Sequence, residues 1–434
     1  MIVRSHRAAL SLLIALLPVV SAVGLSWDEL LDQRVSESVA YRQSVLARRQ
    51  SEQRLAQYDR FHLPYVSIGT GTAGIRYVGG EDGGLQTFGL QPSVSLTNVF
   101  GATVGVGLPL TVRPDPPDGQ DGFTVGDPTL TVSRRIFEEP AATVLGVRAA
   151  LLRAQDAEAA AVADIRIVLV SEIFDARSSA RTLEDARTRL SNARSVQAAS
   201  RDATAARDLE RSVLQLERSV IQAERALRAL DSRVVDHAES LYAEVDRRFS
   251  EWLAALPADT VIPETTRGVQ AQELTLAAAE ARSRLSFLPY LPNPTLSASL
   301  TWDRDDGSVD WSLGLQVSVP LLDRGERALA SFERRESARI ERLRLEQARD
   351  SLGRTLTNAW EDLDLLSIDL RIAELDLEVQ EESAARTRDL YDRGFATEPA
   401  LVSAELGLSA ARLQVERLSD SYRLAQLRIA RYFE

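Results

Sequence analysis

The sequence of 434 residues contains no cysteine, so disulfides, thiolate chemistry and a lipid-acylated cysteine are excluded. Lysine is also missing, and all 51 basic residues are arginines. The three histidines, His6, His62 and His237, are scattered along the chain. They share no spacing typical of a metal site and have no candidate nucleophile beside them. We therefore expect no metal, no cofactor and no catalytic site.

The chain also lacks a positive net charge and long apolar segments. Its formal net charge of -12 argues against a nucleic-acid partner. After residue 22, apolar residues never continue for the 18 or more positions that a membrane-spanning helix needs. If the mature protein crosses a membrane, it must therefore do so with β-strands.

The N-terminus has the three parts of a secretory signal. Arg4, His6 and Arg7 precede an apolar run over residues 8–20, which is followed by small residues up to Ala22. The apolar run is too short to span a bilayer as a helix. We therefore predict a signal peptide over residues 1–22, with cleavage after Ala22 and export of the mature chain.

Most of the mature chain has the periodicity of helices, with a linker at residues 256–266 that contains two prolines. The expected helices cover residues 27–61, 138–200, 204–253, 269–285, 324–393 and 398–432. In the fifth, apolar residues alternate in steps of four and three, which is typical of coiled-coil packing: Leu352, Leu356, Ala359, Leu363, Leu366, Leu370, Ala373 and Leu377. At 1.5 Å per residue this helix would be roughly 100 Å long.

Two strands in the second half alternate strictly between apolar and small polar residues. They cover residues 295–302 and 311–319, and Asp305-Asp306-Gly307 provides the turn between them. Trp302 and Trp311 stand at the turn end, where we expect them to lie near each other on the apolar face. An apolar face with interfacial aromatics predicts a membrane β-hairpin. A soluble sheet is the alternative, but the flanking helices use their apolar positions in their own seams.

The first half repeats this layout with a longer β-segment. Alternating stretches occur at residues 65–69, 93–97, 102–112 and 129–133, and Leu63-Pro64-Tyr65 recurs as Leu288-Pro289-Tyr290. We interpret the chain as a tandem repeat. The first repeat covers residues 23–256, with a β-segment at 64–137. The second covers residues 257–434, with a β-hairpin at 294–320.

The number of strands has a consequence for assembly. One hairpin per repeat gives four strands per chain, and small closed membrane barrels need about eight. Open strand edges are not tolerated in hydrocarbon, so several chains must share one barrel, and twelve strands from three chains close naturally. The two additional alternating stretches are interpreted as an elaborated extracellular loop. A third hairpin, giving six strands per chain, is the alternative.

Three stretches resemble the TolC-type outer-membrane efflux protein (outer membrane factor) family: residues 287–300, 313–325, and 390–404 with Ser421-Tyr422. The resemblance implies a mainly α fold with membrane β, in which a trimeric α-barrel adjoins a shared twelve-stranded transmembrane β-barrel. It further implies an exit duct in the lipid of the outer membrane, with a helical tunnel in the periplasm. A periplasmic adaptor and an inner-membrane transporter would deliver substrates, and the duct itself would catalyse nothing.

The resemblance also implies a gate at the periplasmic tip. Tyr391 matches the family's gate tyrosine, Gly394 the tip glycine and Asp208 the gate aspartate, and a tyrosine–carboxylate hydrogen bond would be a breakable latch. The sequence departs from the pattern elsewhere. The gate arginine position holds Ala396, the positions of an acidic ring hold Ala400 and Ser403, and Asp202 stands where glycine is expected. Arg207 and Arg393 are candidate substitutes as latch cations. Alternatively, Tyr391 and Asp208 only flank helix ends.

A second class of protein shares some of these features. A periplasmic adaptor or a structural coiled-coil protein would also carry a signal peptide and helical hairpins. Such a protein would show one helical hairpin flanked by soluble β-modules, rather than two repeats with membrane-patterned strands. The sequence does not identify the transported cargo.

Overall fold

The computed structural model describes residues 25–60, 63–70, 74–78, 84–97, 102–114, 122–135, 140–199, 203–254, 256–257, 263, 266–291, 294–303, 307–317 and 323–433. The expected signal peptide over residues 1–22, Asp202, and Asp305 and Asp306 of the predicted turn lie outside these ranges. Two compact units divide the chain. The first comprises Met1–Arg42, Ala160–Pro263 and Arg354–Glu434, and the second comprises Gln43–Ala159 and Glu264–Gly353. Each unit takes segments from both of the expected repeats.

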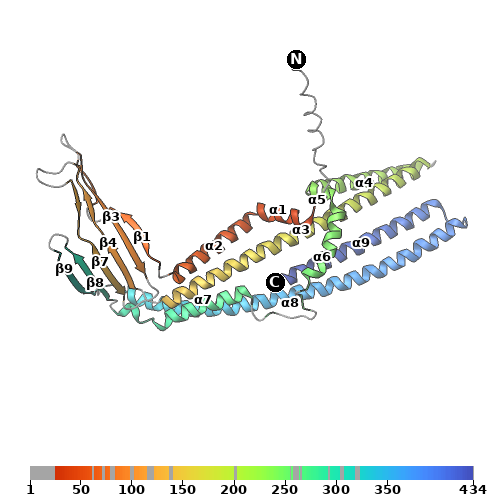
Figure 1. Ribbon diagram of the computed structural model, residues 1–434. Helices are drawn as coiled ribbons and strands as arrows, with labels where there is room; N and C mark the ends of the chain where they lie inside the picture. Colours follow the sequence, from red (N-terminus) through yellow and green to blue (C-terminus); the bar gives the residue numbers. More distant parts are fainter. Residues whose placement is uncertain are drawn as a thin grey trace, which may run out of the picture. The chain divides into compact units, whose positions relative to one another are not determined.

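The strands form one antiparallel sheet in the second unit (Figure 1). Six of them pair side by side in the order β1-β3-β4-β7-β8-β9. β2 pairs with the first part of β3, and β5 and β6 extend the sheet from there. The bounds are β1 Tyr65–Gly69, β2 Ile75–Val78, β3 Gly84–Thr97, β4 Ala102–Gly107, β5 Leu110–Val112, β6 Phe123–Val125, β7 Thr129–Arg135, β8 Thr295–Trp302 and β9 Val309–Gln316.

The four alternating stretches of the first half are therefore all strands of this sheet. Two of these stretches were interpreted as a loop, but β1, β3, β4 and β7 are hydrogen-bonded to one another in register, so the sheet has more than the four strands per chain that were expected. The pattern of the sequence did not indicate β2 and β6. These strands are only four and three residues long, too short to show alternation.

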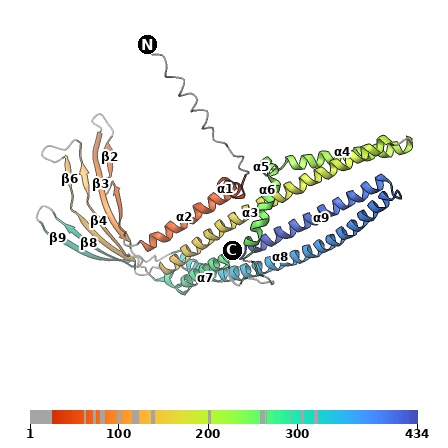
Figure 2. The same cartoon turned by 45° about the vertical axis from the view of Figure 1, so that its right-hand side comes forward.

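The helices agree closely with the periodicity of the sequence. Their bounds are α1 Trp27–Glu37, α2 Val39–Asp59, α3 Pro140–Ala199, α4 Ala203–Arg228, α5 Ser232–Asp236, α6 Ala238–Trp252, α7 Arg267–Arg284, α8 Glu326–Asp392 and α9 Glu398–Ala430, with a 3-10 turn at Leu288–Tyr290. α8 has 67 residues and is therefore about 100 Å long, as predicted. Figure 2 shows α8 and α9 running side by side, and α3 and α4 likewise.

Two stretches that were expected to be continuous helices are interrupted. Ser38 has an extended backbone between α1 and α2. The second break follows α4, which ends at Arg228. Asp231 is the N-cap of the next helix, α5, and its side chain accepts a hydrogen bond from the backbone N–H of Arg233. Short polar side chains compete for backbone hydrogen bonds in this way, and they interrupt a helix without disturbing its apolar period.

An apolar core lies in the first unit. Trp27 and Leu30 of α1 pack there with buried residues of α3 and α6, among them Ile173 and Leu241. The expected seam of α8 is also confirmed within this unit, since Leu356, Leu363 and Ala373 are buried and the intervening seam positions are half-buried. Among the described residues, no helix combines the length and the apolar character that crossing a bilayer requires.

Candidate functional site

The sheet has two chemically different faces that continue across all six strands. Cross-strand partners on one face are apolar apart from Arg134, which lies between Ala102 and Leu296. One apolar row consists of Val66, Val94, Val106, Leu130, Leu300 and Trp311. Partners on the other face are small or polar, and one such row consists of Ser67, Ser93, Gly107, Thr129, Thr301 and Asp310. The alternation seen in the sequence thus becomes a sheet with one apolar and one polar side.

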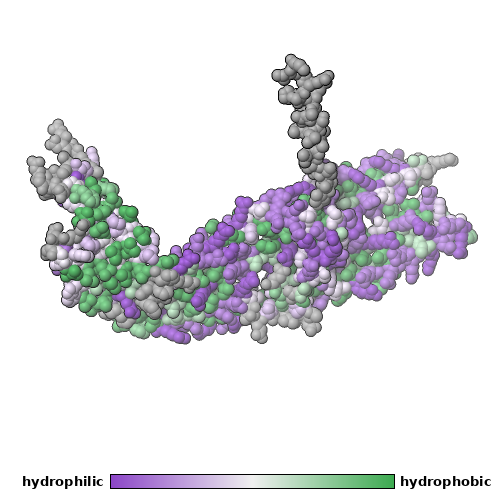
Figure 3. Space-filling view, in the orientation of Figure 1, coloured by the Kyte–Doolittle hydropathy of each residue, from purple (hydrophilic) through white to green (hydrophobic). Residues whose placement is uncertain are grey.

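The apolar face is exposed rather than packed on a core. Ile68, Leu313 and Trp311 expose 71%, 66% and 75% of their surface. Figure 3 shows apolar residues gathered over the strands, whereas the helices present mainly hydrophilic residues. A monomeric soluble protein rarely exposes so large an apolar patch, which marks a surface that contacts a partner or lipid.

Trp302 and Trp311 lie on this apolar face, as the sequence predicted. Trp302 is paired with Val309, and Trp311 with Leu300, so the two indoles are diagonal neighbours at one end of the hairpin. Both are exposed. Gly307 occupies the turn with a φ of 72°, a conformation that glycine adopts without strain.

The turn between α8 and α9 is closed by Gly394. Its φ is 78°, and the N–H groups of Phe395 and Gly394 donate to the carbonyl oxygens of Leu390 and Tyr391, at 2.7 and 2.9 Å. This is the left-handed C-terminal cap that glycine favours. The helix end thereby fixes the position of Tyr391, whose side chain remains 39% exposed.

The other expected gate residues are also at the surface. Arg207 and Asp208 are exposed on α4. Arg393 forms an ion pair with Asp389, one turn earlier on α8, at 2.9 Å. In the described part of one chain, no hydrogen bond or ion pair joins Tyr391 to Asp208. The structure therefore brings Tyr391, Arg393 and Gly394 together at one helix end, but not Tyr391 with Asp208.

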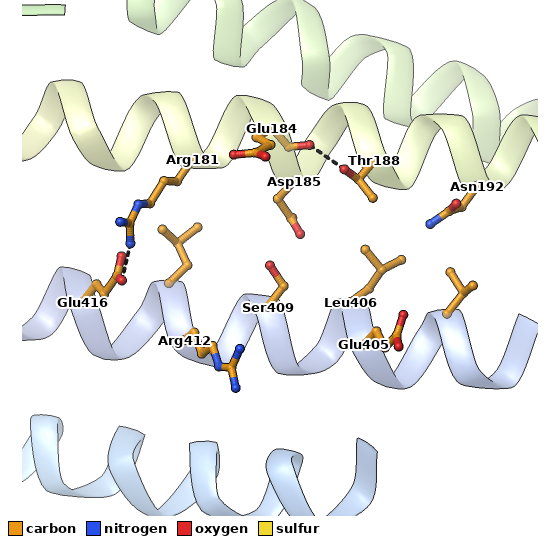
Figure 4. Close-up of a pocket in the computed structure, with 12 residues that line it drawn as sticks. Arg181, Glu184, Asp185, Thr188, Asn192, Glu405, Leu406, Ser409, Arg412 and Glu416 are labelled. Atoms are coloured by element: carbon orange, nitrogen blue, oxygen red, sulfur yellow. Dashed lines mark hydrogen bonds and ion pairs between the residues drawn. The ribbon is translucent and has the colours of Figure 1, made fainter. Parts of the chain in front are cut away.

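A cleft between α3 and α9 was not found from the sequence. It encloses about 720 Å³ (Figure 4). Arg181 of α3 forms an ion pair with Glu416 of α9, and Arg189 donates to the carbonyl oxygen of Leu406 at 3.3 Å. Figure 4 shows Asp185 and Ser409 pointing toward each other across the cleft. From the sequence, such charges are expected to be solvated helix faces, because the spacing of residues within one helix does not reveal their partners on another helix.

A buried carboxyl group lies near this cleft, on α9. Asp420 is 7% exposed and accepts a hydrogen bond from the hydroxyl of Tyr242 at 3.2 Å. Arg423 donates to the same hydroxyl at 3.3 Å, and the guanidinium of Arg177 lies 3.7 Å from the centre of the Tyr242 ring. Burial raises the pKa of Asp420 to about 6 despite the two neighbouring arginines. It also raises the pKa of Tyr242.

Solved structures share this fold over nearly the whole chain. The outer membrane protein VceC from Vibrio cholerae matches with a TM-score of 0.58 and 11% identity, covering 93% of this chain and 94% of that one. The open-state MtrE outer membrane channel of Neisseria gonorrhoeae matches with a TM-score of 0.56 and 15% identity, covering 93% and 88%. The CmeC outer membrane channel of Campylobacter jejuni matches with a TM-score of 0.56 and 11% identity, covering 94% and 85%.

This chain thus shares its fold, helical hairpins together with an amphipathic sheet, with solved outer-membrane channels. Residues 264–433 match the sequence model of the outer membrane efflux protein family, whereas no curated protein matches the chain significantly. The family match over this part of the chain and the shared fold confirm the resemblance to outer membrane efflux proteins that was expected from the sequence.

Proposed function

We propose that this protein is the outer-membrane exit duct of a tripartite export system and works as a homotrimer. Its strands form a shared barrel in the outer membrane, and its helices form a tunnel in the periplasm. A periplasmic adaptor and an inner-membrane transporter supply the substrate. One observation carries this proposal: the apolar face of the sheet extends over six strands and is exposed, as a surface in contact with lipid must be.

A second apolar stripe on α8 supports assembly with other copies. Five exposed residues follow alternating steps of three and four: Leu365, Ile368, Ile372, Leu375 and Val379. The stripe has the spacing of a coiled-coil seam and lies apart from the seam that is buried within the chain. A helix with two seams has a neighbour on each side, which is the requirement for a closed ring of helices.

The rival function, a periplasmic adaptor or structural coiled-coil protein, lacks this support. Two long helical hairpins, α3–α4 and α8–α9, accompany one sheet whose apolar face is open. Membrane fractionation tests the proposal. We expect the protein in outer-membrane fractions as an oligomer that dissociates on heating in detergent. Recovery as a soluble periplasmic monomer would contradict the duct and favour the rival.

The proposed gate lies at the helix ends near Tyr391 and Asp208. Both side chains are accessible, and the ion pair of Arg393 with Asp389 is exposed enough to exchange partners. In the closed trimer, Tyr391 donates a hydrogen bond to Asp208, and Arg207, Arg393 or Asp202 adds charge at the tip. Trp302 and Trp311 anchor the barrel at the interface with water.

The gate predicts an effect on conductance. Tyr391→Phe combined with Asp208→Ala removes both partners of the latch, so the single-channel conductance in planar bilayers should rise. Tyr422→Phe, which alters a tyrosine of α9 away from the turn, should leave the conductance unchanged. Equal conductance of the double variant and the unmodified protein would remove the latch but not the duct.

A further inference from the structure

We propose that the transmembrane barrel of this protein has eighteen strands, six from each of three chains, and that β1 of one chain pairs with β9 of the next. This inference rests on the proposed trimeric duct and deepens it. The family resemblance implies twelve strands, which is four per chain. The structure instead contains six strands that pair side by side in one sheet.

The hydrogen-bonded ladder is continuous from β1 to β9. All five pairings, β1–β3, β3–β4, β4–β7, β7–β8 and β8–β9, are antiparallel and keep their register without a shift. The irregularity in this region lies between β2 and β3, outside the six-stranded part. The β1–β3 pair is therefore part of the same wall as the β8–β9 hairpin.

The chemistry of the two faces is the same at both edges of this wall. Val66 and Ile68 of β1 are 66% and 71% exposed on the apolar face, comparable with Leu313 and Leu315 of β9 at 66% and 61%. On the polar face, the hydroxyls of Ser67 and Ser93 are 2.8 Å apart, and those of Ser299 and Ser312 are 2.7 Å apart. An extracellular loop surrounded by water would have no need for exposed valine and isoleucine on alternate residues.

The two free edges are complementary in direction. Because neighbouring strands are antiparallel and six is an even number, β1 and β9 run in opposite directions. β9 of one chain therefore continues into β1 of the next by the same antiparallel pairing, and the repeat closes into a ring. Unpaired edges in hydrocarbon would cost several kcal/mol per group, so both edges must be covered. A four-stranded contribution would have to break the β3–β4 ladder, which joins five residue pairs.

The strand number determines the width of the barrel. With strands about 4.8 Å apart and tilted by about 40°, eighteen strands give a backbone diameter of about 36 Å, and twelve give about 24 Å. Barrels of 16–18 strands enclose an aqueous channel in porins. The outer-membrane part of this duct is thus wider than a twelve-stranded barrel would be.

Cysteine cross-linking tests the pairing, because the natural chain contains no cysteine. Ser67→Cys or Tyr65→Cys in β1 is combined with Asp310→Cys or Ser312→Cys in β9, all on the polar face. We expect oxidation to link neighbouring chains into covalent trimers. The matched comparison places the first cysteine in β4 instead, as Thr103→Cys, which should give no links. Ser299→Cys with Ser312→Cys is the positive control, since it joins neighbouring strands of one chain.

The outcomes separate this inference from the proposed function. Two results would overturn the eighteen-stranded barrel. One is a disulfide between β9 and β4, and the other is no disulfide between β1 and β9 although the disulfide of the positive control forms. Averaged end-on views of the purified oligomer by electron cryomicroscopy give an answer that does not depend on register: eighteen strands support the inference and twelve refute it. A twelve-stranded trimer leaves the duct intact, whereas the absence of any outer-membrane oligomer contradicts the duct itself.

Discussion

The apolar face of the sheet and the cleft between α3 and α9 suit opposite surroundings. Leu313 and Trp311 expose two thirds or more of their surface on the sheet. In the cleft, the side chains of Arg181 and Glu416 pair while 35% and 37% exposed. An open face of leucine and tryptophan is favoured against hydrocarbon, whereas a partly exposed ion pair avoids most of its desolvation cost only where water still reaches the charges. One chain therefore has one surface suited to hydrocarbon and another suited to water. A charge introduced on an apolar surface should have a different effect from the same charge on a polar surface.

The largest effect is expected from a charge on the apolar face. Leu313→Arg places a guanidinium in the middle of β9, where lipid contact would cost about 2–4 kcal/mol per chain. Ser312→Arg, one residue away on the polar face, should cost much less because that side chain would meet water inside the proposed barrel. The midpoint of urea unfolding in lipid vesicles measures both. Equal effects would show that the two faces do not meet different solvents.

The second stripe of α8 should matter nearly as much. Ile372 is 52% exposed in one chain but is covered in the proposed ring, and burying such a side chain is worth about 1.5–3 kcal/mol. Ile372→Glu should therefore lower the fraction of heat-resistant oligomer. Ser367→Glu introduces the same charge at an exposed position outside the stripe and should leave the oligomer intact. If both variants assemble normally, the stripe is not an interface.

The β8–β9 hairpin and the helix α8 show which features of the fold the sequence could predict. The alternation in residues 295–302 and the heptad steps from Leu352 to Leu377 are local patterns, and both became elements with the expected faces. The number of strands in the sheet was missed because it depends on which strands pair, and β4 pairs with β7 across more than twenty residues. The contact of Tyr242 with Asp420 spans 178 residues, so no local pattern could have indicated it.

The raised pKa of Asp420 predicts that the stability of the first unit depends on pH. The pKa of Asp420 in the fold is about 6, above the usual 3.8, so folding favours the protonated form. The stability that this group adds is complete below pH 4 and is lost as the pH rises through 6, a change on the order of 3 kcal/mol. Asp420→Asn should therefore be more stable than the unmodified protein at pH 7.5.

Thermal unfolding at pH 4.5 and 7.5 measures this difference. The advantage of Asp420→Asn at pH 7.5 should shrink at pH 4.5, where the carboxyl group is largely protonated. Glu405→Asn provides the control, since Glu405 pairs with Arg388 at the surface. An advantage that is the same at both pH values would show that Asp420 does not titrate between them.

The smallest effects concern two glycines of the helical hairpin. Gly394→Ala forces a residue with a side chain to adopt a φ of 78° at the end of α8, which should cost about 1 kcal/mol, even though a Cβ there would meet no atom within 4 Å. Gly353 lies inside α8, and a Cβ there would also meet no atom within 4 Å. Gly353→Ala should therefore stabilise the helix by up to about 1 kcal/mol. Opposite shifts of the thermal midpoint are expected, and a stabilising Gly394→Ala would show that the turn does not need the left-handed cap.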